Sequence, residues 1–158
     1  MVPKKILVCT DFSENSEPAR QLAVEYAKAF GAQLIIVHVI DSWAAFPTYV
    51  DWVTNERQDF LARIQETVGA RLDAMSKECG QEVSEVKTHL KLGLPAKEIA
   101  RIAQEGKADL VVLGTHGWTG VRHLLVGSVA RNVLRTVHRP VLIVESPISR
   151  VELPDEPY

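Results

Sequence analysis

The chain has 158 residues, enough for one domain with a real core and little more. Hydrophobic residues make up 46% and charged residues 24%, values close to globular averages, which exclude disorder for the body of the chain. The net charge of −2 comes from 18 basic and 20 acidic residues mixed along the sequence, without the basic stripe of a nucleic-acid-binding protein.

Short apolar runs alternate with helical patterns in the first half. Ile6–Cys9 predicts a strand, and the helical pattern that follows it stops naturally at Gly31. Leu34–Ile40 is almost wholly apolar and β-branched, which is typical of a strand buried on both faces. After an aromatic-rich stretch, 41–53, a long helix is expected. Its predicted core positions are Phe60, Ile64, Val68, Leu72 and Met75.

The second half continues the alternation. Val83–Leu92 alternates imperfectly and predicts an edge strand. A helix begins near Pro95 and ends at Gly106, and Asp109–Leu113 is a further buried strand. The last helix, the last strand and a tail follow at 129–137, 141–144 and 146–158.

Five strands joined in turn by helices imply parallel pairing with right-handed crossovers. We therefore predict an α/β fold: an open, doubly wound, five-stranded parallel sheet with helices on both faces. Residues 1–145 form a single domain in this interpretation, and residues 146–158 form a flexible tail. Periodicity does not give the strand order, but ligands of such sheets bind outside the carboxyl ends of strands, where the strand order reverses.

Residues suited to phosphate binding follow the fourth strand. Gly114 and Gly117 open a glycine-rich loop, and Gly127 and Ser128 stand at the start of the last helix. Glycines let a phosphate approach the backbone, and a helix N-terminus adds N–H donors and a partial positive charge. Arg122, between the two glycine pairs, could contact a phosphate as a forked donor. The loop is neither a Walker A motif nor a Rossmann fingerprint.

The carboxylate of Asp11 is expected on the opposite side of the same predicted crevice. Thr10 and Asp11 follow the first strand directly and could hold a base, a ribose or a metal. Taken alone, Asp11 and Ser13 could merely cap the first helix, and Ser128 the last one. The convergence of separate parts of the chain on one crevice favours a binding site.

Together these residues carry a specific resemblance. Gly114, Gly117, Gly127 and Ser128 match in full the motif G-x2-G-x9-G-[ST] of the ATP-binding branch of the universal stress proteins. The likeness covers nearly the whole chain. Further similar segments are 4–8, 10–13, 38–41, 93–95 and 139–144. Cys9 departs from the pattern, because relatives often carry other small or apolar residues there, including proline.

The resemblance implies a strand order of 3-2-1-4-5 and a bound adenine nucleotide, expected to be ATP, alone or with Mg²⁺. In such proteins the base lies near residues matching Thr10, Asp11 and Val39. The residues matching the phosphate contacts are Gly114, Thr115, Gly117, Gly127, Ser128 and Val129. The family also forms homodimers by pairing the last strands, here Val141, Leu142, Ile143 and Val144.

Catalysis is less well supported than binding. His116 is the well-placed candidate for a general base, but no partner carboxylate near the glycine loop suggests efficient phosphoryl transfer. We expect a dimeric, ATP-binding stress-response module with at most slow hydrolysis. Two alternatives stay open: an ATPase or nucleotidyl-transfer enzyme on the same fold, and an interaction protein that binds no nucleotide. The role of the aromatic segment 43–52 and the identity of any protein partner also stay open.

The cellular setting is expected to be the cytoplasm. No apolar stretch approaches the ~20 residues that span a bilayer, and no signal peptide is recognised. The two cysteines, Cys9 and Cys79, do not suggest a disulfide framework, and Cys79 is expected near the surface. These features predict a protein without membrane contact.

Overall fold

A single parallel sheet forms the centre of the molecule. The computed structural model describes residues 2–42, 54–115 and 126–146. The strand order is β3-β2-β1-β4-β5 and every neighbouring pair is parallel, which confirms the predicted fold and order. The strands are β1 (Lys5–Cys9), β2 (Gln33–Asp41), β3 (Val86–Gly93), β4 (Leu110–Gly114) and β5 (Val141–Val144).

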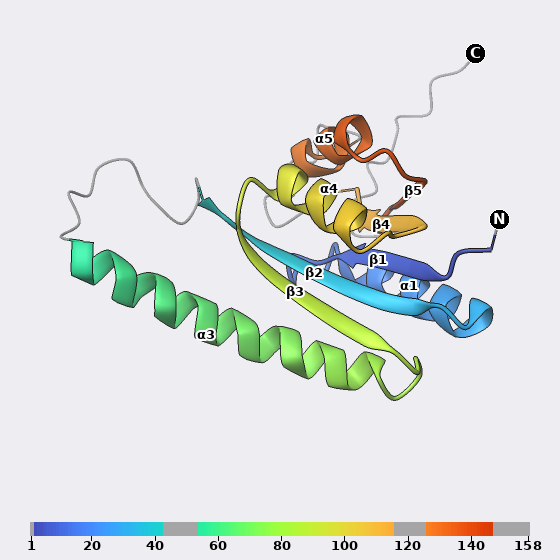
Figure 1. Cartoon of the computed structure of the whole chain (residues 1–158), viewed down its shortest axis with the longest axis horizontal. Coiled ribbons are helices and arrows are strands. Elements are labelled where there is room, and N and C mark those ends of the chain that lie inside the picture. The colour runs from blue at the N-terminus through green and yellow to red at the C-terminus, as the bar shows by residue number, and fades with distance from the viewer. Residues whose placement is uncertain (1, 43–53, 116–125, 147–158) are drawn as a thin grey trace, which may run out of the picture.

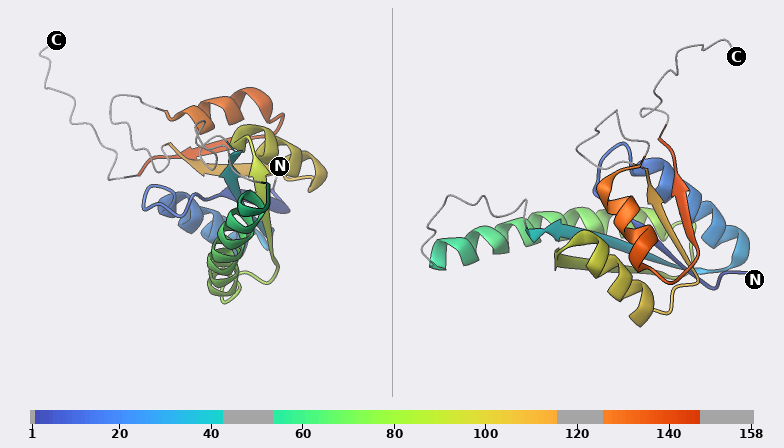
Figure 2. Two further views of the ribbon diagram at one scale, coloured as in Figure 1. Left: turned by 90° about the vertical axis from the view of Figure 1, so that its left-hand side faces the viewer. Right: turned by 90° about the horizontal axis from the view of Figure 1, so that it is seen from above.

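Helices cover both faces of this sheet (Figure 1). Two of them, α1 and α3, pack on one face, and α4 and α5 pack on the other. Figure 2 shows the same three layers from two further directions. The helices are α1 (Glu17–Phe30), α3 (Thr54–Cys79), α4 (Pro95–Glu105) and α5 (Ser128–Thr136).

Proline and glycine set several helix ends. Pro18 and Pro95 stand in the first turns of α1 and α4, where the fixed φ of proline suits a helix and its missing N–H costs nothing. Gly31 ends α1 in the left-handed conformation, with φ of 62°. A side chain would be strained there, so the glycine predicted as a helix stop has a conformational reason.

The interior strand β2, which lies between β3 and β1, sends alternate side chains into two cores. Leu34 and Ile36 pack with α1 and α3, whereas Ile35 and Val37 pack with α4 and α5. All four side chains are at most 2% exposed. The prediction of a strand buried on both faces is confirmed, and the alternation fixes which side of the sheet each later residue faces.

The structure corrects two predictions near the end of α3. The strand predicted from Val83 begins at Val86 instead. Val83 lies in the preceding turn, where its N–H donates to the carbonyl of Cys79 at 2.9 Å and its side chain is buried. Cys79 was expected near the surface but is only 2% exposed, because the end of α3 packs into the core shared with α1.

Only the C-terminal part of α3 packs fully into the core. Of the five predicted core positions, Leu72 is buried, whereas Phe60 is 38% exposed and the other three are partly exposed. Figure 1 shows why: the first turns of α3 lie beyond the end of the sheet. Periodicity identifies the apolar face of a helix, but it does not say how far the sheet extends beneath that face.

The described part of the chain ends one residue into the predicted tail. Ser146, the first residue assigned to the tail, is only 1% exposed, so the packed part of the chain reaches at least this residue. The remainder of the predicted tail, 147–158, and the aromatic segment 43–53 lie outside the described residues. Among the helices that the structure describes, none is long and apolar enough to cross a membrane.

Candidate functional site

The carboxyl ends of β1 and β4 lie at about the same level of the sheet, and the neighbouring strand β2 runs four residues further, to Asp41. Cys9 on β1 stands opposite Val37 on β2, and Val8 stands opposite Val112 on β4. The amide of Thr10 continues the β1–β2 ladder by donating to the carbonyl of Val37 at 3.0 Å. Continued one or two residues further, these registers bring the Thr10–Asp11 turn, Val39 and Gly114 to one carboxyl edge, as predicted.

The two halves of the glycine motif are in direct contact. The amide of Gly127 donates to the carbonyl of Thr115 at 2.7 Å, and the amide of Thr115 donates to the carbonyl of Val144 at 3.0 Å. Thr115 is buried and links the ends of β4 and β5 to the start of α5. Gly114 and Thr115 therefore share one small region with Gly127.

The N-terminus of α5 lies beside this contact. Gly127 is its N-cap, with φ −63° and ψ 163°, and this residue has no side chain that could cap the first turn. The first turn carries no acidic residue, and Ser128 and Val129 are both exposed. The amides of this turn and the positive end of the helix dipole are consequently available to an anion.

Arg131 is a basic side chain in the first turns of this helix. Its guanidinium reaches back to the carbonyl of Val126 at 3.5 Å. It follows Ser128 by three residues, so both lie on one face of the first turn of α5. That spacing was the available signal for a cation beside the predicted phosphate position.

The β1–α1 loop is held by side-chain hydrogen bonds. Asp11 Oδ1 accepts from the amide of Ser13 at 3.0 Å and from its hydroxyl group. The N-cap of α1 is Ser16, so Asp11 and Ser13 shape the loop and do not cap the helix. Phe12 adopts φ of 60°, a left-handed conformation that is rare for a bulky residue.

The Thr10 side chain belongs to the α1–α3 side of the sheet. Its hydroxyl accepts from the amide of Phe12 at 3.0 Å and lies 3.2 Å from the Ser16 hydroxyl. Its carbonyl lies 2.8 Å from Nδ1 of His38. Because a carbonyl oxygen only accepts, Nδ1 of His38 carries the proton and donates to Thr10.

Burial lowers the pKa of His38 below its ordinary value of 6.5, although the Thr10 carbonyl and Asp11 act in the opposite direction. A histidine with a lowered pKa in the folded state binds protons more readily when unfolded, so its contribution to stability is lost as the pH falls below about 6.5.

We expect the free energy of unfolding to fall between pH 7 and pH 5, and to fall less in His38→Asn, which keeps a donor for Thr10. Urea titrations across this pH range measure the free energy of unfolding of both proteins. An equal pH dependence in the parent and in His38→Asn would contradict this role of His38.

Cys9 and Val39 present an apolar surface on the opposite side of the sheet, facing α4 and α5. Both are partly exposed and pack against the core cluster of that side. Burial raises the pKa of the Cys9 thiol to about 12, so the group is neutral and unreactive at pH 7. The departure from the family pattern at this position thus adds a small apolar surface and no reactive thiolate.

Three predicted residues fall outside the described part of the chain: Gly117, Arg122 and the base candidate His116. Over the ranges that the structure does describe, no three His, Cys, Asp or Glu side chains gather closely enough to hold a metal ion.

Fold and strand order together define a doubly wound α/β protein whose strand order reverses between β1 and β4, the position where ligands of such sheets bind. The chain matches the family model of the universal stress protein family over residues 3–145, and it belongs to that family.

Relatives cover nearly the whole chain. It is 35% identical over 152 residues to the universal stress protein MJ0531 of Methanocaldococcus jannaschii, an alignment spanning 91% of this chain and 83% of that protein. The solved structure of MJ0577 from the same organism aligns with a TM-score of 0.83 at 29% identity, covering 92% of this chain and 98% of that one. A universal stress protein solved in complex with cAMP aligns with a TM-score of 0.68 at 25% identity, over 92% and 98%.

Proposed function

We propose that this protein binds an adenine nucleotide, ATP, in the crevice at the carboxyl ends of β1 and β4. The observation that carries the proposal is the contact between Thr115 and Gly127 at the start of α5, where the N-cap residue has no side chain. A nucleotide is also the ligand of the relative that was solved with cAMP.

The phosphates lie against α5 in this proposal. Backbone amides of Ser128 and Val129 supply donors, Gly114 and Gly127 leave space, and the helix dipole favours negative charge. Arg131 adds a positive charge one turn into the helix. Phosphate oxygens would coordinate the magnesium ion. Among the described residues, no group of three His, Cys, Asp or Glu side chains could hold it.

The adenine base lies at the facing lip, near Asp11 and Val39. The Thr10 hydroxyl is already bonded within the loop, so Thr10 would act through its backbone and through the shape of the loop. The apolar surface of Cys9 and Val39 offers a flat contact for the base on the same side of the sheet as α5.

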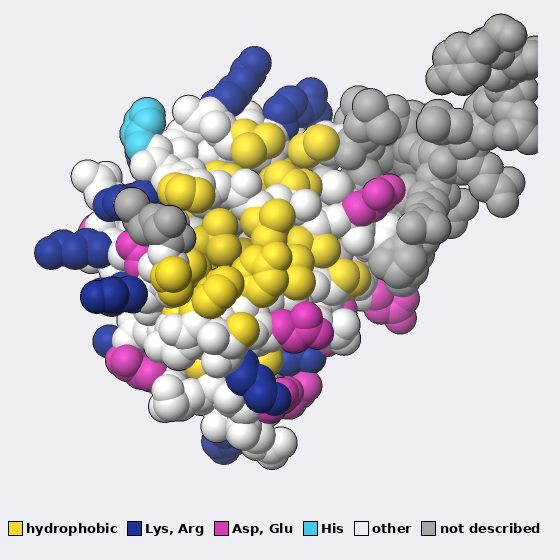
Figure 3. All heavy atoms as spheres, turned by 90° about the vertical axis from the view of Figure 1, so that its right-hand side faces the viewer, with side chains coloured by type: hydrophobic (Ala, Val, Ile, Leu, Met, Phe, Trp, Pro, Cys, Tyr) yellow, Lys and Arg dark blue, Asp and Glu magenta, His cyan; other side chains and the backbone are white. Residues whose placement is uncertain are grey.

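The activity we propose is regulated binding, with at most slow hydrolysis, in a cytoplasmic homodimer. Figure 3 shows hydrophobic side chains gathered over β5 at the edge of the sheet. All four residues of β5 are partly exposed, and an unpaired apolar edge strand favours pairing with a second copy.

Release of co-purified nucleotide by denaturation, followed by chromatography and a titration with ATP and Mg²⁺, tests this function. ATP in the released fraction, or binding at ~10⁻⁶ M with little hydrolysis, supports the proposal. Released ADP with rapid turnover, abolished in His116→Ala, favours the enzyme alternative. Neither released nucleotide nor measurable binding would overturn the proposal in favour of the interaction-protein alternative.

A further inference from the structure

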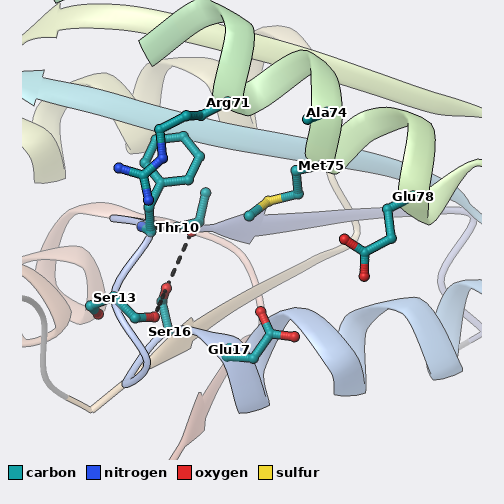
Figure 4. A pocket seen from close by; sticks show the side chains of 9 residues that line it. Thr10, Ser13, Ser16, Glu17, Arg71, Ala74, Met75 and Glu78 are labelled. Carbon is teal, nitrogen blue, oxygen red and sulfur yellow. Dashed lines mark hydrogen bonds between the residues drawn. The ribbon is translucent and has the colours of Figure 1, made fainter. Parts of the chain in front are cut away.

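A cavity of about 310 Å³ opens between the β1–α1 loop, α1 and α3 (Figure 4). It lies on the side of the sheet that Leu34 and Ile36 face, away from Cys9, Val39 and α5. It is therefore separate from the crevice proposed for the nucleotide. The lining residues are Thr10, Phe12, Ser13, Ser16, Glu17, Arg71, Ala74, Met75 and Glu78.

One face of α3 forms a wall of this cavity. Arg71, Ala74, Met75 and Glu78 are spaced at i, i+3, i+4 and i+7, so they lie in one row along the helix. Figure 4 shows Arg71 and Glu78 at opposite ends of the row, with Met75 between them. Seven residues of helix separate the two charged residues by roughly 10 Å along the axis. The wall thus has a basic end, an apolar middle and an acidic end.

The basic end offers donors that form no ion pair with a carboxylate of the described residues. The guanidinium carbon of Arg71 lies 4.5 Å from the centre of the Phe12 ring. None of the ion pairs between described residues involves Arg71. The flat face of a guanidinium stacks on an aromatic ring, and this contact holds the guanidinium in place. The N–H groups at the edge of the guanidinium remain able to bind a carboxylate in forked geometry.

The acidic end carries an excess negative charge. Glu17 and Glu78 share a single cation, with Arg20 Nη2 at 2.5 Å from Glu17 and 2.9 Å from Glu78. The hydrogen bond from Arg20 lowers the pKa of Glu17, which keeps that carboxylate ionised at neutral pH. Two carboxylates on one guanidinium leave one uncompensated negative charge, which favours a cationic group nearby.

The hydroxyl groups along the cavity can only accept further hydrogen bonds. Ser16 donates to the carbonyl of Ser13 at 2.9 Å, and the Ser13 hydroxyl donates to Asp11. Each hydroxyl has one hydrogen, so in the Thr10–Ser16 pair the hydrogen must come from Thr10. With all three hydrogens used, a ligand beside these hydroxyls must itself be a donor, as an ammonium group is.

We propose that this cavity binds a small zwitterion whose ammonium and carboxylate groups are joined by a short apolar chain, of the ω-amino carboxylate class. The carboxylate pairs with Arg71, the chain packs against Ala74 and Met75, and the ammonium lies toward Glu17 and Glu78. The volume is at the lower end of the range of ligand pockets, which suits a molecule of this size. This proposal does not rest on the proposed nucleotide function.

Calorimetric titration of the full-length protein, without nucleotide, tests the site with δ-aminovalerate as the probe. Valerate lacks the ammonium group and pentylamine lacks the carboxylate, so each should bind roughly tenfold more weakly or not at all. Arg71→Gln should weaken δ-aminovalerate binding by a similar factor. Arg63→Gln removes an exposed arginine two turns earlier on the same helix and should change nothing.

Amide chemical shifts measured by NMR during the same titration report the location. Perturbations confined to α3 residues 71–78 and the β1–α1 loop support the site. Equal affinity for valerate or pentylamine, equal affinity of Arg71→Gln, or no binding of δ-aminovalerate would each overturn it. Because no nucleotide is present, these outcomes leave the ATP proposal untouched, and failure of ATP to bind leaves this site untouched.

Discussion

Replacing Gly127 with valine is expected to weaken ATP binding roughly tenfold or more, because a branched side chain would overpack the space proposed for the phosphates. The backbone itself tolerates the change. Gly127 has φ −63° and ψ 163°, an ordinary extended conformation, and its amide would still donate to Thr115. Valine is a poor N-cap, so we also expect a loss of about 1 kcal/mol in the free energy of unfolding. Isothermal titration with ATP and a urea melt separate the two effects.

Gly69→Ala is the matched control. A β-carbon there would meet only Leu90 Cδ2, at 4.0 Å, and alanine is the better helix residue, so stability should hold or rise while the affinity for ATP stays unchanged. If a folded Gly127→Val protein bound ATP as tightly as the parent, the phosphates would have to lie elsewhere.

Placing lysine at Ile143 is expected to convert the proposed homodimer into a monomer. A charge in the middle of β5 would have to be desolvated between two paired strands, a cost of several kcal/mol that a short edge interface cannot offset. Light scattering should then report 17.6 kDa in place of twice that mass.

Leu94→Lys provides the comparison for this second variant. Leu94 is 47% exposed and directly follows β3, at the opposite edge of the sheet from β5, so the dimer mass should persist. Ile143 also packs on the α4–α5 core, and a thermal melt therefore checks that the monomer remains folded. A parent protein of 17.6 kDa, or a folded Ile143→Lys protein of dimer mass, would remove β5 as the interface.

The alternation of strands and helices could be predicted from the sequence because each element has its own periodicity. Buried strands such as Leu34–Ile40 need apolar side chains on both faces, and that requirement is visible in any single stretch. Strand order was available only through the resemblance, since periodicity does not record which strands are neighbours. The residues assigned to the phosphates also came from the resemblance, because their glycines form a fixed motif, and this assignment stays a prediction.

Features made by contacts between distant segments were not predictable. Val83 has the apolar character of a strand residue, yet it fills the core from a turn because Cys79 accepts its amide hydrogen bond. The partial exposure of Phe60 depends on where the sheet ends, which no local pattern encodes. The cavity beside α3 was missed because the row from Arg71 to Glu78 resembles any amphipathic helix face until Phe12 and Arg20 are placed beside it.

The β1–α1 loop contributes residues to both proposed sites, the nucleotide site and the zwitterion site. Phe12 lies in this loop in a left-handed conformation. Asp11, proposed for the nucleotide base, is followed directly by the ring on which Arg71 rests. A zwitterion that shifts the conformation of this loop would change the affinity of the protein for ATP by some factor. Thermodynamic linkage requires that ATP then changes the affinity for the zwitterion by the same factor. The occupancy of each site would therefore depend on the concentration of the ligand bound on the opposite side of the sheet.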